Sequence, residues 1–182
     1  DMKENKIKLN KQFIEVFTCV LATAVVSHLE GDPLWLYVVG SPGSGKTLLT
    51  NSLFNSEHCF HTSKVTATQL VSGQNSREDN SDPSLIPQLD NKTLVMKDYT
   101  EIIDMGGSAQ AEMLSVLRGA YDRTLTRTYG NGTIRRYKSK FSIVAGVTGK
   151  IYQTTQAALG ERFLRIHLDA IGGKDPSEQI SA

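Results

Sequence analysis

A glycine-rich segment carries the clearest chemistry in this sequence. Residues 40–47 read Gly-Ser-Pro-Gly-Ser-Gly-Lys-Thr and fill every fixed position of the phosphate-binding loop pattern. The glycines let the backbone curl until its N–H groups point at phosphate oxygens. Lys46 supplies positive charge for the β- and γ-phosphates, and the Thr47 hydroxyl can ligate Mg²⁺. We therefore predict a nucleoside triphosphate site formed by Gly40, Ser41, Pro42, Gly43, Ser44, Gly45, Lys46, Thr47 and Leu48.

A carboxylate is expected beside the metal ion, and Asp98 is the candidate. Asp98 follows residues 93–96, which read as a short buried strand, so its side chain would face the phosphates. The usual pattern ends in an Asp-Glu pair, whereas this chain has Lys97-Asp98-Tyr99. Two assignments stay open: Asp98 ligates Mg²⁺ and Glu101 is the base, or Asp98 is the base and Lys97 stands at the metal position. The structural alternative is that Asp98 caps a helix.

Two further polar residues stand where a triphosphate site needs them. Thr148 follows the apolar run 141–146, and its hydroxyl can hydrogen-bond the γ-phosphate or the attacking water. An ordinary turn threonine is the alternative. Arg162 precedes a predicted strand, and its guanidinium could reach the γ-phosphate of a neighbouring subunit and stabilise transition-state charge. The alternative for Arg162 is a salt bridge to Glu161 or to the sheet.

A basic hairpin gives the clue to the substrate. Residues 123–129 and 133–138 alternate large and polar side chains around Gly130-Asn131-Gly132, which predicts two antiparallel strands and a glycine turn. No Asp or Glu occurs between Arg123 and Gly160. Positive charge interleaved with aromatic rings suits a phosphate backbone and stacked bases, and a solvated face or a subunit contact is the alternative. The candidate nucleic-acid contacts are Arg127, Tyr129, Arg135, Arg136 and Lys138.

The elements that must position these residues follow from the apolar pattern. Five strands joined by helices, with the nucleotide at the end of the first strand, predict an α/β fold with a doubly wound parallel sheet. We expect strands at 34–39, 59–65, 93–96, 141–146 and 163–168. We expect helices at 11–29, 47–54, 108–121 and 154–159, and a loop at 72–87.

Composition sets the outer limits of the function. The chain has 182 residues, 39% of them hydrophobic and 21% charged, with a formal net charge of +1, as in an ordinary globular domain. Charged and polar residues interrupt the longest apolar stretch, residues 13–29, so we expect no membrane span, no signal peptide and a cytoplasmic location. Cys19 and Cys59 lack metal-motif spacing and are expected to be reduced thiols.

Taken in order, the motifs resemble the core of the AAA+ ATPases over residues 31–168. Residues 40–47 match Walker A, residues 93–98 resemble an imperfect Walker B, and Thr148 stands where sensor 1, usually Asn, lies. Glu161-Arg162-Phe163 resembles the segment that carries the arginine finger. The hairpin resembles the pre-sensor-1 hairpin of a subset that includes the minichromosome maintenance and viral hexameric helicases. The whole set is also similar to helicase-type ATPases of phages and mobile elements that accompany primases.

This resemblance implies a P-loop NTPase fold, with a β-hairpin inserted before the fourth strand of the core. Residues 1–30 would contribute a helix packing on the core, residues 31–171 the AAA+ core, and residues 172–182 a tail without a lid domain. ATP and Mg²⁺ would be the cofactors, with Thr47 and Asp98 at the metal. The catalytic residues implied are Lys46, Asp98, Glu101, Thr148 and Arg162.

The implied function is a motor that hydrolyses ATP and acts on nucleic acid. The resemblance points to a DNA helicase or translocase in replication, built as a homo-oligomeric, hexameric ring around single-stranded DNA. A protein-remodelling or regulatory AAA+ switch would use the same ATP site but would contact protein through its hairpin. A small-molecule kinase also has a phosphate loop, but it needs neither Glu161-Arg162-Phe163 nor an acid-free hairpin.

Overall fold

Five parallel strands form the central sheet of the protein. The computed structural model describes residues 11–76, 80–152, 159 and 161–169. Every residue of β1, β3 and β6 is buried, as expected for a parallel sheet covered on both faces. The strands are β1 (Trp35–Val39), β2 (Cys59–Thr62), β3 (Thr93–Met96), β6 (Ser142–Val147) and β7 (Phe163–His167).

The strand order decides what meets at the carboxyl edge of the sheet. The order is β2-β3-β6-β1-β7, so β6 lies between the strand before the phosphate loop and the strand before Asp98. Val39 of β1 is in register with Val147 of β6, and Met96 of β3 with Ala145. Because all five strands are parallel, the loop, Asp98 and Thr148 leave the sheet at the same edge.

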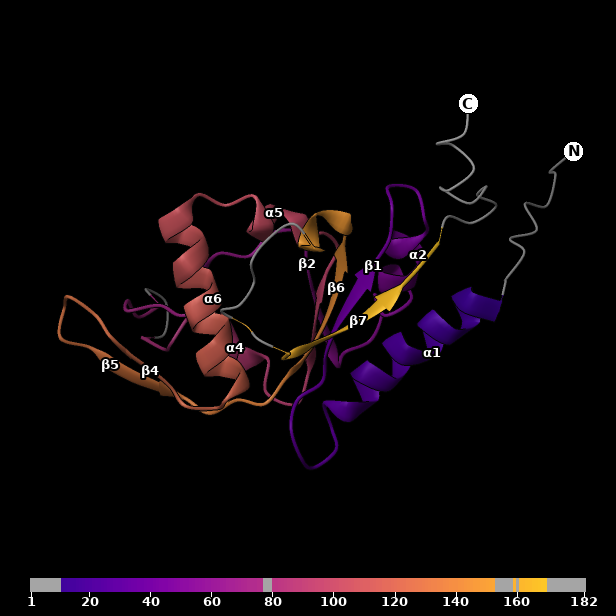
Figure 1. Cartoon of the computed structure of the whole chain (residues 1–182). Coiled ribbons are helices and arrows are strands. Elements are labelled where there is room, and N and C mark those ends of the chain that lie inside the picture. The colour runs from indigo at the N-terminus through magenta and orange to yellow at the C-terminus, as the bar shows by residue number, and fades with distance from the viewer. Residues whose placement is uncertain (1–10, 77–79, 153–158, 160, 170–182) are drawn as a thin grey trace, which may run out of the picture.

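Helices cover the two faces of the sheet (Figure 1). One face packs Leu36, Val38 and Val144 against helices α1 (Lys11–Val26) and α2 (Lys46–Asn51). The opposite face carries the larger core, which alternate strand residues such as Tyr37 and Ile143 form with four helices. These helices are α3 (Ala67–Leu70), α4 (Leu85–Gln88), α5 (Thr100–Ile103) and α6 (Gly107–Tyr121).

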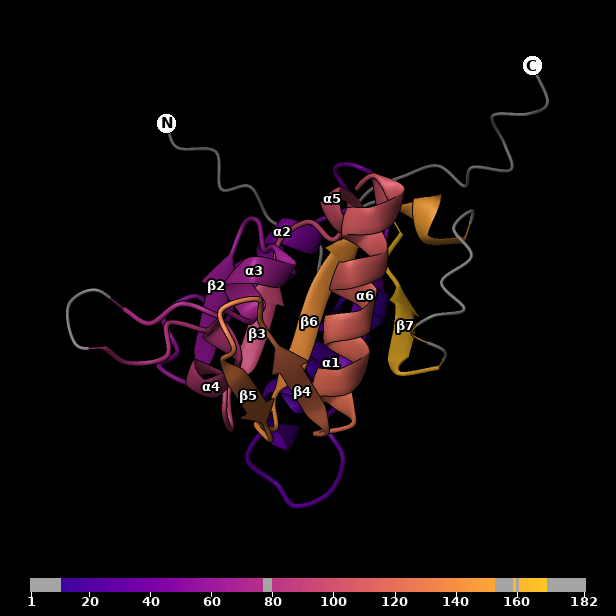
Figure 2. The same ribbon diagram turned by 90° about the vertical axis from the view of Figure 1, so that its left-hand side faces the viewer.

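A separate two-stranded sheet precedes β6. Strands β4 (Leu125–Thr128) and β5 (Ile134–Tyr137) pair antiparallel and lie beside α6 and α4 (Figure 2). The Tyr129 N–H donates to the Thr133 carbonyl at 2.9 Å, and Gly132 closes the turn with a positive φ of 82° that suits glycine. The hairpin predicted from residues 123–138 is therefore present.

Several element boundaries differ from those expected. Helix α1 ends at Val26 rather than at residue 29, because the chain tightens into successive turns in which His28 and Leu29 donate to Val25 and Val26. Strand β2 ends at Thr62 rather than at residue 65, and the expected loop 72–87 contains the start of α4. The helix expected at 154–159 and the tail 172–182 lie outside the described residues, apart from Leu159. Among the described residues, no helix is both long and apolar enough to cross a membrane.

Candidate nucleotide site

The phosphate loop connects β1 to α2 and has the backbone geometry that its glycines allow. The Gly40 N–H donates to the Val147 carbonyl at 3.1 Å, which ties the start of the loop to β6. Gly43 and Gly45 have positive φ values of 80° and 96°, in the region that residues with a Cβ rarely adopt. The glycines of the motif therefore permit the backbone conformation that the loop adopts.

Gly40 is required because of space. A Cβ placed on Gly40 would lie 2.5 Å from Ser44 Oγ and 2.6 Å from the carbonyl oxygen of Leu168. Leu168 directly follows β7, and its N–H donates to the Val39 carbonyl at 2.8 Å. Any side chain at position 40 would therefore push the loop away from the sheet edge.

Lys46 points back into the loop. Its Nζ donates to the carbonyl oxygens of Gly40 and Ser41, both at 2.7 Å. Burial lowers the pKa of Lys46, and the charge of Asp98 opposes that shift. The ammonium group is therefore held among loop carbonyls and close enough to Asp98 to interact with its charge, while Thr47 and Leu48 are exposed at the start of α2.

Asp98 lies two residues before α5 and faces a cavity. Its Oδ1 accepts a hydrogen bond from the Thr100 N–H at 2.8 Å in a local turn, whereas the N-cap residue of α5 is Tyr99, which makes no side-chain cap hydrogen bond. The same side chain and Glu101 line a cavity of about 410 Å³, together with Lys64, Thr100, Asp104 and Met105. The two predicted carboxylates are thus brought together at one cavity, and none of residues 40–48 lines it.

The residues on either side of Asp98 are turned away from that cavity. The Lys97 ammonium lies 5.8 Å from the ring centre of Phe54, on the α2 side of the sheet. Tyr99 is fully buried against Tyr37, and burial raises the pKa of Tyr99 to about 12, so its hydroxyl stays neutral. Neither residue is placed to supply the acid missing from the usual pair.

Two buried hydroxyls suit phosphate oxygens. Ser44 Oγ in the loop and Thr148 Oγ1 after β6 are both buried, and neither has a hydrogen-bond partner in the described part of the chain. An unpaired buried hydroxyl costs free energy, which a phosphate oxygen bound at the loop would recover. These donors, the glycine-formed loop and the Lys46 ammonium fit a triphosphate. Within the described ranges, no three His, Cys, Asp or Glu side chains converge on a metal site. Thr47 and Asp98 stay the candidate residues for Mg²⁺ beside the phosphates.

Arg162 lies at the opposite edge of the sheet. Phe163, the residue after Arg162, is in register with Trp35, the first residue of β1. The phosphate loop follows Val39, the last residue of β1, which is four strand steps of about 3.3 Å each from Trp35. The Arg162 guanidinium pairs with Asp122 at 2.9 Å rather than with Glu161, the partner considered from the sequence. Arg162 is therefore not part of the phosphate site of its own chain.

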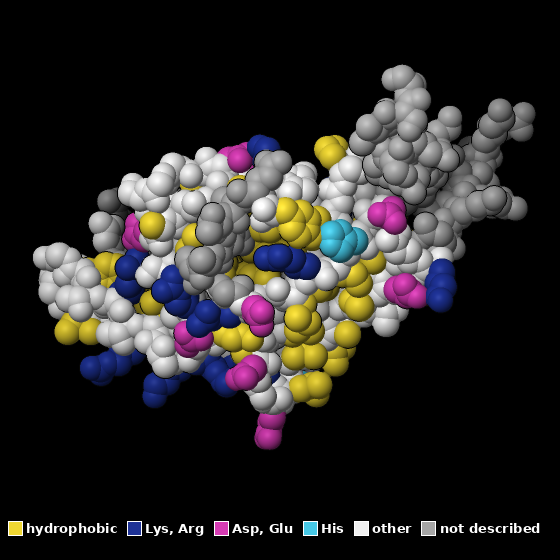
Figure 3. All heavy atoms as spheres, viewed as in Figure 1, with side chains coloured by type: hydrophobic (Ala, Val, Ile, Leu, Met, Phe, Trp, Pro, Cys, Tyr) yellow, Lys and Arg dark blue, Asp and Glu magenta, His cyan; other side chains and the backbone are white. Residues whose placement is uncertain are grey.

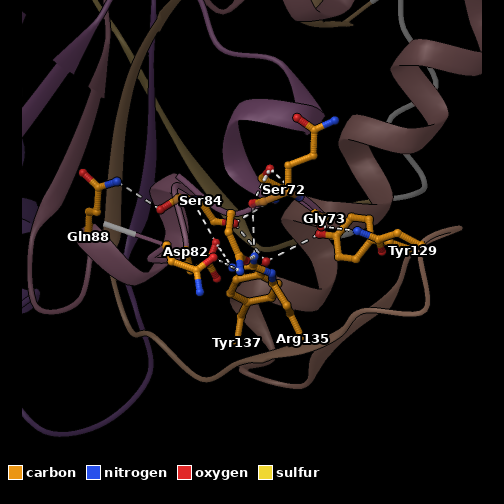
Figure 4. Close-up of polar contacts among 12 residues, drawn as sticks. Ser72, Gly73, Asp82, Ser84, Gln88, Tyr129, Arg135 and Tyr137 are labelled. Atoms are coloured by element: carbon orange, nitrogen blue, oxygen red, sulfur yellow. Dashed lines mark hydrogen bonds and ion pairs between the residues drawn. The ribbon is translucent and has the colours of Figure 1, made fainter. Parts of the chain in front are cut away.

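The basic hairpin residues divide between two faces. Tyr129 packs on Gly73, where a Cβ would come within 2.4 Å of the ring, and Arg127 donates to Glu112 at 2.6 Å. Arg135 is only 11% exposed and donates to Asp82, to Asn75 Oδ1 and to the Gln74 carbonyl (Figure 4). These three candidate contacts face the body of the domain.

Arg136 and Lys138 are on the other face of the hairpin. Side chains alternate along a strand, so Arg136 points away from the side on which Arg135 and Tyr137 lie. Arg136 and Lys138 are exposed, as are Thr126, Thr128 and Ile134. Figure 3 shows Lys and Arg side chains gathered over the hairpin end of the molecule. We call Thr126, Thr128, Ile134, Arg136 and Lys138 the outer face of the hairpin.

Some residues of the site were missed from the sequence. Gly146 is one: a Cβ there would lie 2.7 Å from the Lys97 carbonyl and 3.8 Å from Lys46 Cβ, so β6 must be bare where it passes the loop. Nothing in its local sequence sets Gly146 apart from other glycines. The outer face was missed as a unit, although the period-two alternation of residues 125–129 and 134–137 contained the signal.

The comparisons with known proteins bear on the fold. Neither a protein-family model nor a curated protein sequence matches this chain. Crystal structures of NtrX from Brucella abortus resemble it: one in complex with ADP at a TM-score of 0.55 and 15% identity, and one in complex with ATP at 0.52 and 15%. A third NtrX structure has a TM-score of 0.52 and 13% identity.

The extent of this likeness limits what it shows. The three matches cover 90%, 87% and 92% of this chain, but the chain spans only 37%, 36% and 39% of the NtrX chains. At such identities the likeness concerns the fold alone. It supports the α/β fold with a parallel sheet that the motifs imply.

Proposed function

We propose that this chain is the ATPase core of a motor that moves on nucleic acid, with the outer face of the hairpin as its contact surface. The observation that carries the ATPase part is the meeting of the phosphate loop, Asp98 and Thr148 at one edge of the sheet. NtrX, whose structures share the fold, was crystallised in complex with ADP and in complex with ATP, which supports a nucleotide ligand for this chain.

Each residue at the edge has a definite task in this proposal. Lys46 leaves the carbonyls of Gly40 and Ser41 and donates to phosphate oxygens. Asp98, whose charge acts on Lys46, takes the proton of the attacking water, with Glu101 across the same cavity. Thr148 orients the γ-phosphate or the water through its buried hydroxyl.

The metal and the neighbouring subunit complete the site. Mg²⁺, when bound at Thr47, neutralises charge on the phosphates. Lys97 replaces the first acid of the usual pair, so we expect slow turnover. Arg162 would act on the nucleotide of the adjacent subunit in a ring, because its own loop lies at the other end of β1.

The nucleic-acid part rests on the outer face. Arg136 on β5 and Lys138 directly after β5 are two exposed cations, and Thr126 and Thr128 on β4 are exposed beside them. Exposed cations and hydroxyls suit phosphate contacts, which weaken as salt rises. Arg127, Tyr129 and Arg135 act in this proposal by holding the hairpin in place.

The decisive test is ATP turnover by the full-length protein, with and without single-stranded DNA, at two salt concentrations. If the protein is a motor on nucleic acid, DNA should stimulate ATP turnover, and the stimulation should weaken at the higher salt concentration. The double variant Arg136→Ala/Lys138→Ala should lose the stimulation and keep basal turnover. Lys11→Ala, which removes an exposed cation at the start of α1, on the opposite side of the molecule from the hairpin (Figure 1), is the control.

A regulatory AAA+ switch is the second candidate, and two observations favour it. Lys97 occupies an acidic position of the usual pattern, and NtrX, whose structures share the fold, was crystallised with both ADP and ATP. A switch would show turnover that DNA does not change at either salt concentration. That result would redirect the outer face to a protein partner.

A further inference from the structure

The guanidinium of Arg162 is fully engaged within its own chain. Nε donates to Asp122 Oδ1 at 3.2 Å, and Nη2 donates to the two Asp122 oxygens at 3.0 and 2.9 Å. Nη1 donates to the Leu159 carbonyl at 3.1 Å, and the group lies 5.5 Å from the ring centre of Tyr121. All three nitrogens of Arg162 thus have acceptors, and the pair is bidentate.

Asp122 occupies a position where a carboxylate is unfavourable by itself. It is the C-terminal cap of α6, at the negative end of the helix dipole. The backbone leaves the helix at Arg123, which has a positive φ of 54°. A cation beside Asp122 offsets this unfavourable placement, and Arg162 provides it. The pair therefore joins the end of α6 to the start of β7.

The same helix is joined to the hairpin. A Cβ on Gly119 would meet Leu125 Cδ1 at 2.8 Å, so β4 lies directly against the last turn of α6. Arg127 of β4 donates to Glu112 of α6 at 2.6 Å. Only two residues separate Asp122 from the first residue of β4. Helix α6 therefore connects the hairpin to the end of the helix that pairs with Arg162.

We propose that Asp122 is a positioning residue that keeps Arg162 from the neighbouring subunit's nucleotide until the hairpin is loaded. The inference rests on the proposed function, because it takes Arg162 as the arginine finger. A guanidinium with all three nitrogens donating within its chain has no free fork for a γ-phosphate. Arg162 must leave Asp122 to act, and movement of the hairpin through α6 supplies the release.

The test compares basal and DNA-stimulated ATP turnover in the full-length protein. Asp122→Asn keeps an oxygen acceptor but removes the charge, so basal turnover should rise about fivefold, as expected for release of a partly exposed ion pair. Stimulation by single-stranded DNA should shrink correspondingly. Asp122→Glu, which retains the charge, should behave as the wild type. Asp32→Asn is the matched control, because it breaks the neighbouring ion pair with Arg123.

Three outcomes decide the inference. A rise in basal turnover that disappears in Asp122→Asn/Arg162→Ala supports it, since a purely structural role would not accelerate the reaction. Unchanged or lower basal turnover in Asp122→Asn, with DNA stimulation lost in Arg162→Ala, overturns the holding role and leaves the ATPase proposal standing. Equal DNA-stimulated turnover in the wild type and Arg162→Ala overturns both the finger and its hold. If Asp122→Asn does not fold, Asp122→Ser puts the same question.

Discussion

The phosphate-loop edge and the hairpin differ in what determines their functional residues. At the loop edge, two glycine positions are defined by backbone space: a Cβ on Gly40 or on Gly146 would lie within 2.7 Å of a backbone carbonyl oxygen. In the hairpin, function is defined by side-chain direction, because Arg135 and Arg136 are adjacent and yet one is enclosed while the other is exposed. The spacing of motif residues therefore identifies the phosphate loop, whereas in the hairpin only the alternation of side-chain direction distinguishes enclosed residues from exposed ones.

The difference shows what basic composition can and cannot indicate. Seven Lys and Arg residues between 123 and 150 suggested a single interaction surface. The structure assigns Arg127 to Glu112 and Arg135 to Asp82, and leaves Arg136 and Lys138 exposed. A cluster of cations in sequence can therefore combine internal ion pairs with a smaller surface.

The largest expected effect tests the loop side of this comparison. Lys46→Ala removes the only loop cation, and we expect ATP affinity to fall roughly 100-fold, as for loss of a charged hydrogen-bonding group. Lys97→Ala is the matched control, because the Lys97 ammonium lies over Phe54. Titration of both variants with a fluorescent ATP analogue measures the effect. Wild-type affinity in Lys46→Ala would refute the site.

A smaller effect sharpens the hairpin side. Arg135→Ala leaves the Asp82 carboxylate unpaired at 30% exposure, so the free energy of unfolding should fall by about 2 kcal/mol. Arg136→Ala should change it by less than about 0.5 kcal/mol. Urea denaturation of the two variants gives the comparison directly. Equal destabilisation by both substitutions would contradict the division of the hairpin into two faces.

The smallest effect concerns acid pH. Burial acts to raise the pKa of Asp82, but hydrogen bonds from Arg135 and Ser84 outweigh it and lower the pKa below its ordinary value. A lowered carboxyl pKa stabilises the fold above the unfolded pKa of about 3.9, and this contribution is lost as pH falls through the folded pKa.

In Asp82→Asn, the free energy of unfolding should therefore fall less on acidification below about pH 4, by up to about 1 kcal/mol relative to the wild type. Stability is followed by thermal unfolding between neutral pH and acid. Asp104→Asn, which removes the exposed pair with Lys150, serves as the control. An identical pH profile in Asp82→Asn and the wild type would show that this pair does not set the hairpin's stability.

Local pattern predicted much of the fold. The strand at 93–96 has the expected bounds, and the phosphate loop follows its strand as expected, because each depends on a few adjacent residues. The helix from 107 to 121 differs by one residue from its expected start. Apolar periodicity and glycine geometry are local, so the sequence specifies them directly.

Contacts between distant segments were not predictable in the same way. The pairing of Arg162 with Asp122 joins residues that are 40 positions apart, and the neighbouring Glu161 was the partner the sequence offered. The contacts of Arg135 with Gln74 and Asp82 likewise depend on where residues 72–76 and 80–84 lie relative to β5. Such pairs depend on how distant segments of the chain are arranged in the fold, and no local sequence pattern predicts that arrangement.

The division of the hairpin has a consequence for how the protein can evolve. Its inner residues, such as Tyr137 bonded to Ser84 at 2.9 Å, are constrained by folding. The outer face makes no comparable demand, so substitutions there carry little cost in stability. Substitutions on the outer face can therefore change what the hairpin binds without destabilising the domain. We expect related chains to keep the inner residues of the hairpin while their outer faces and ligands differ.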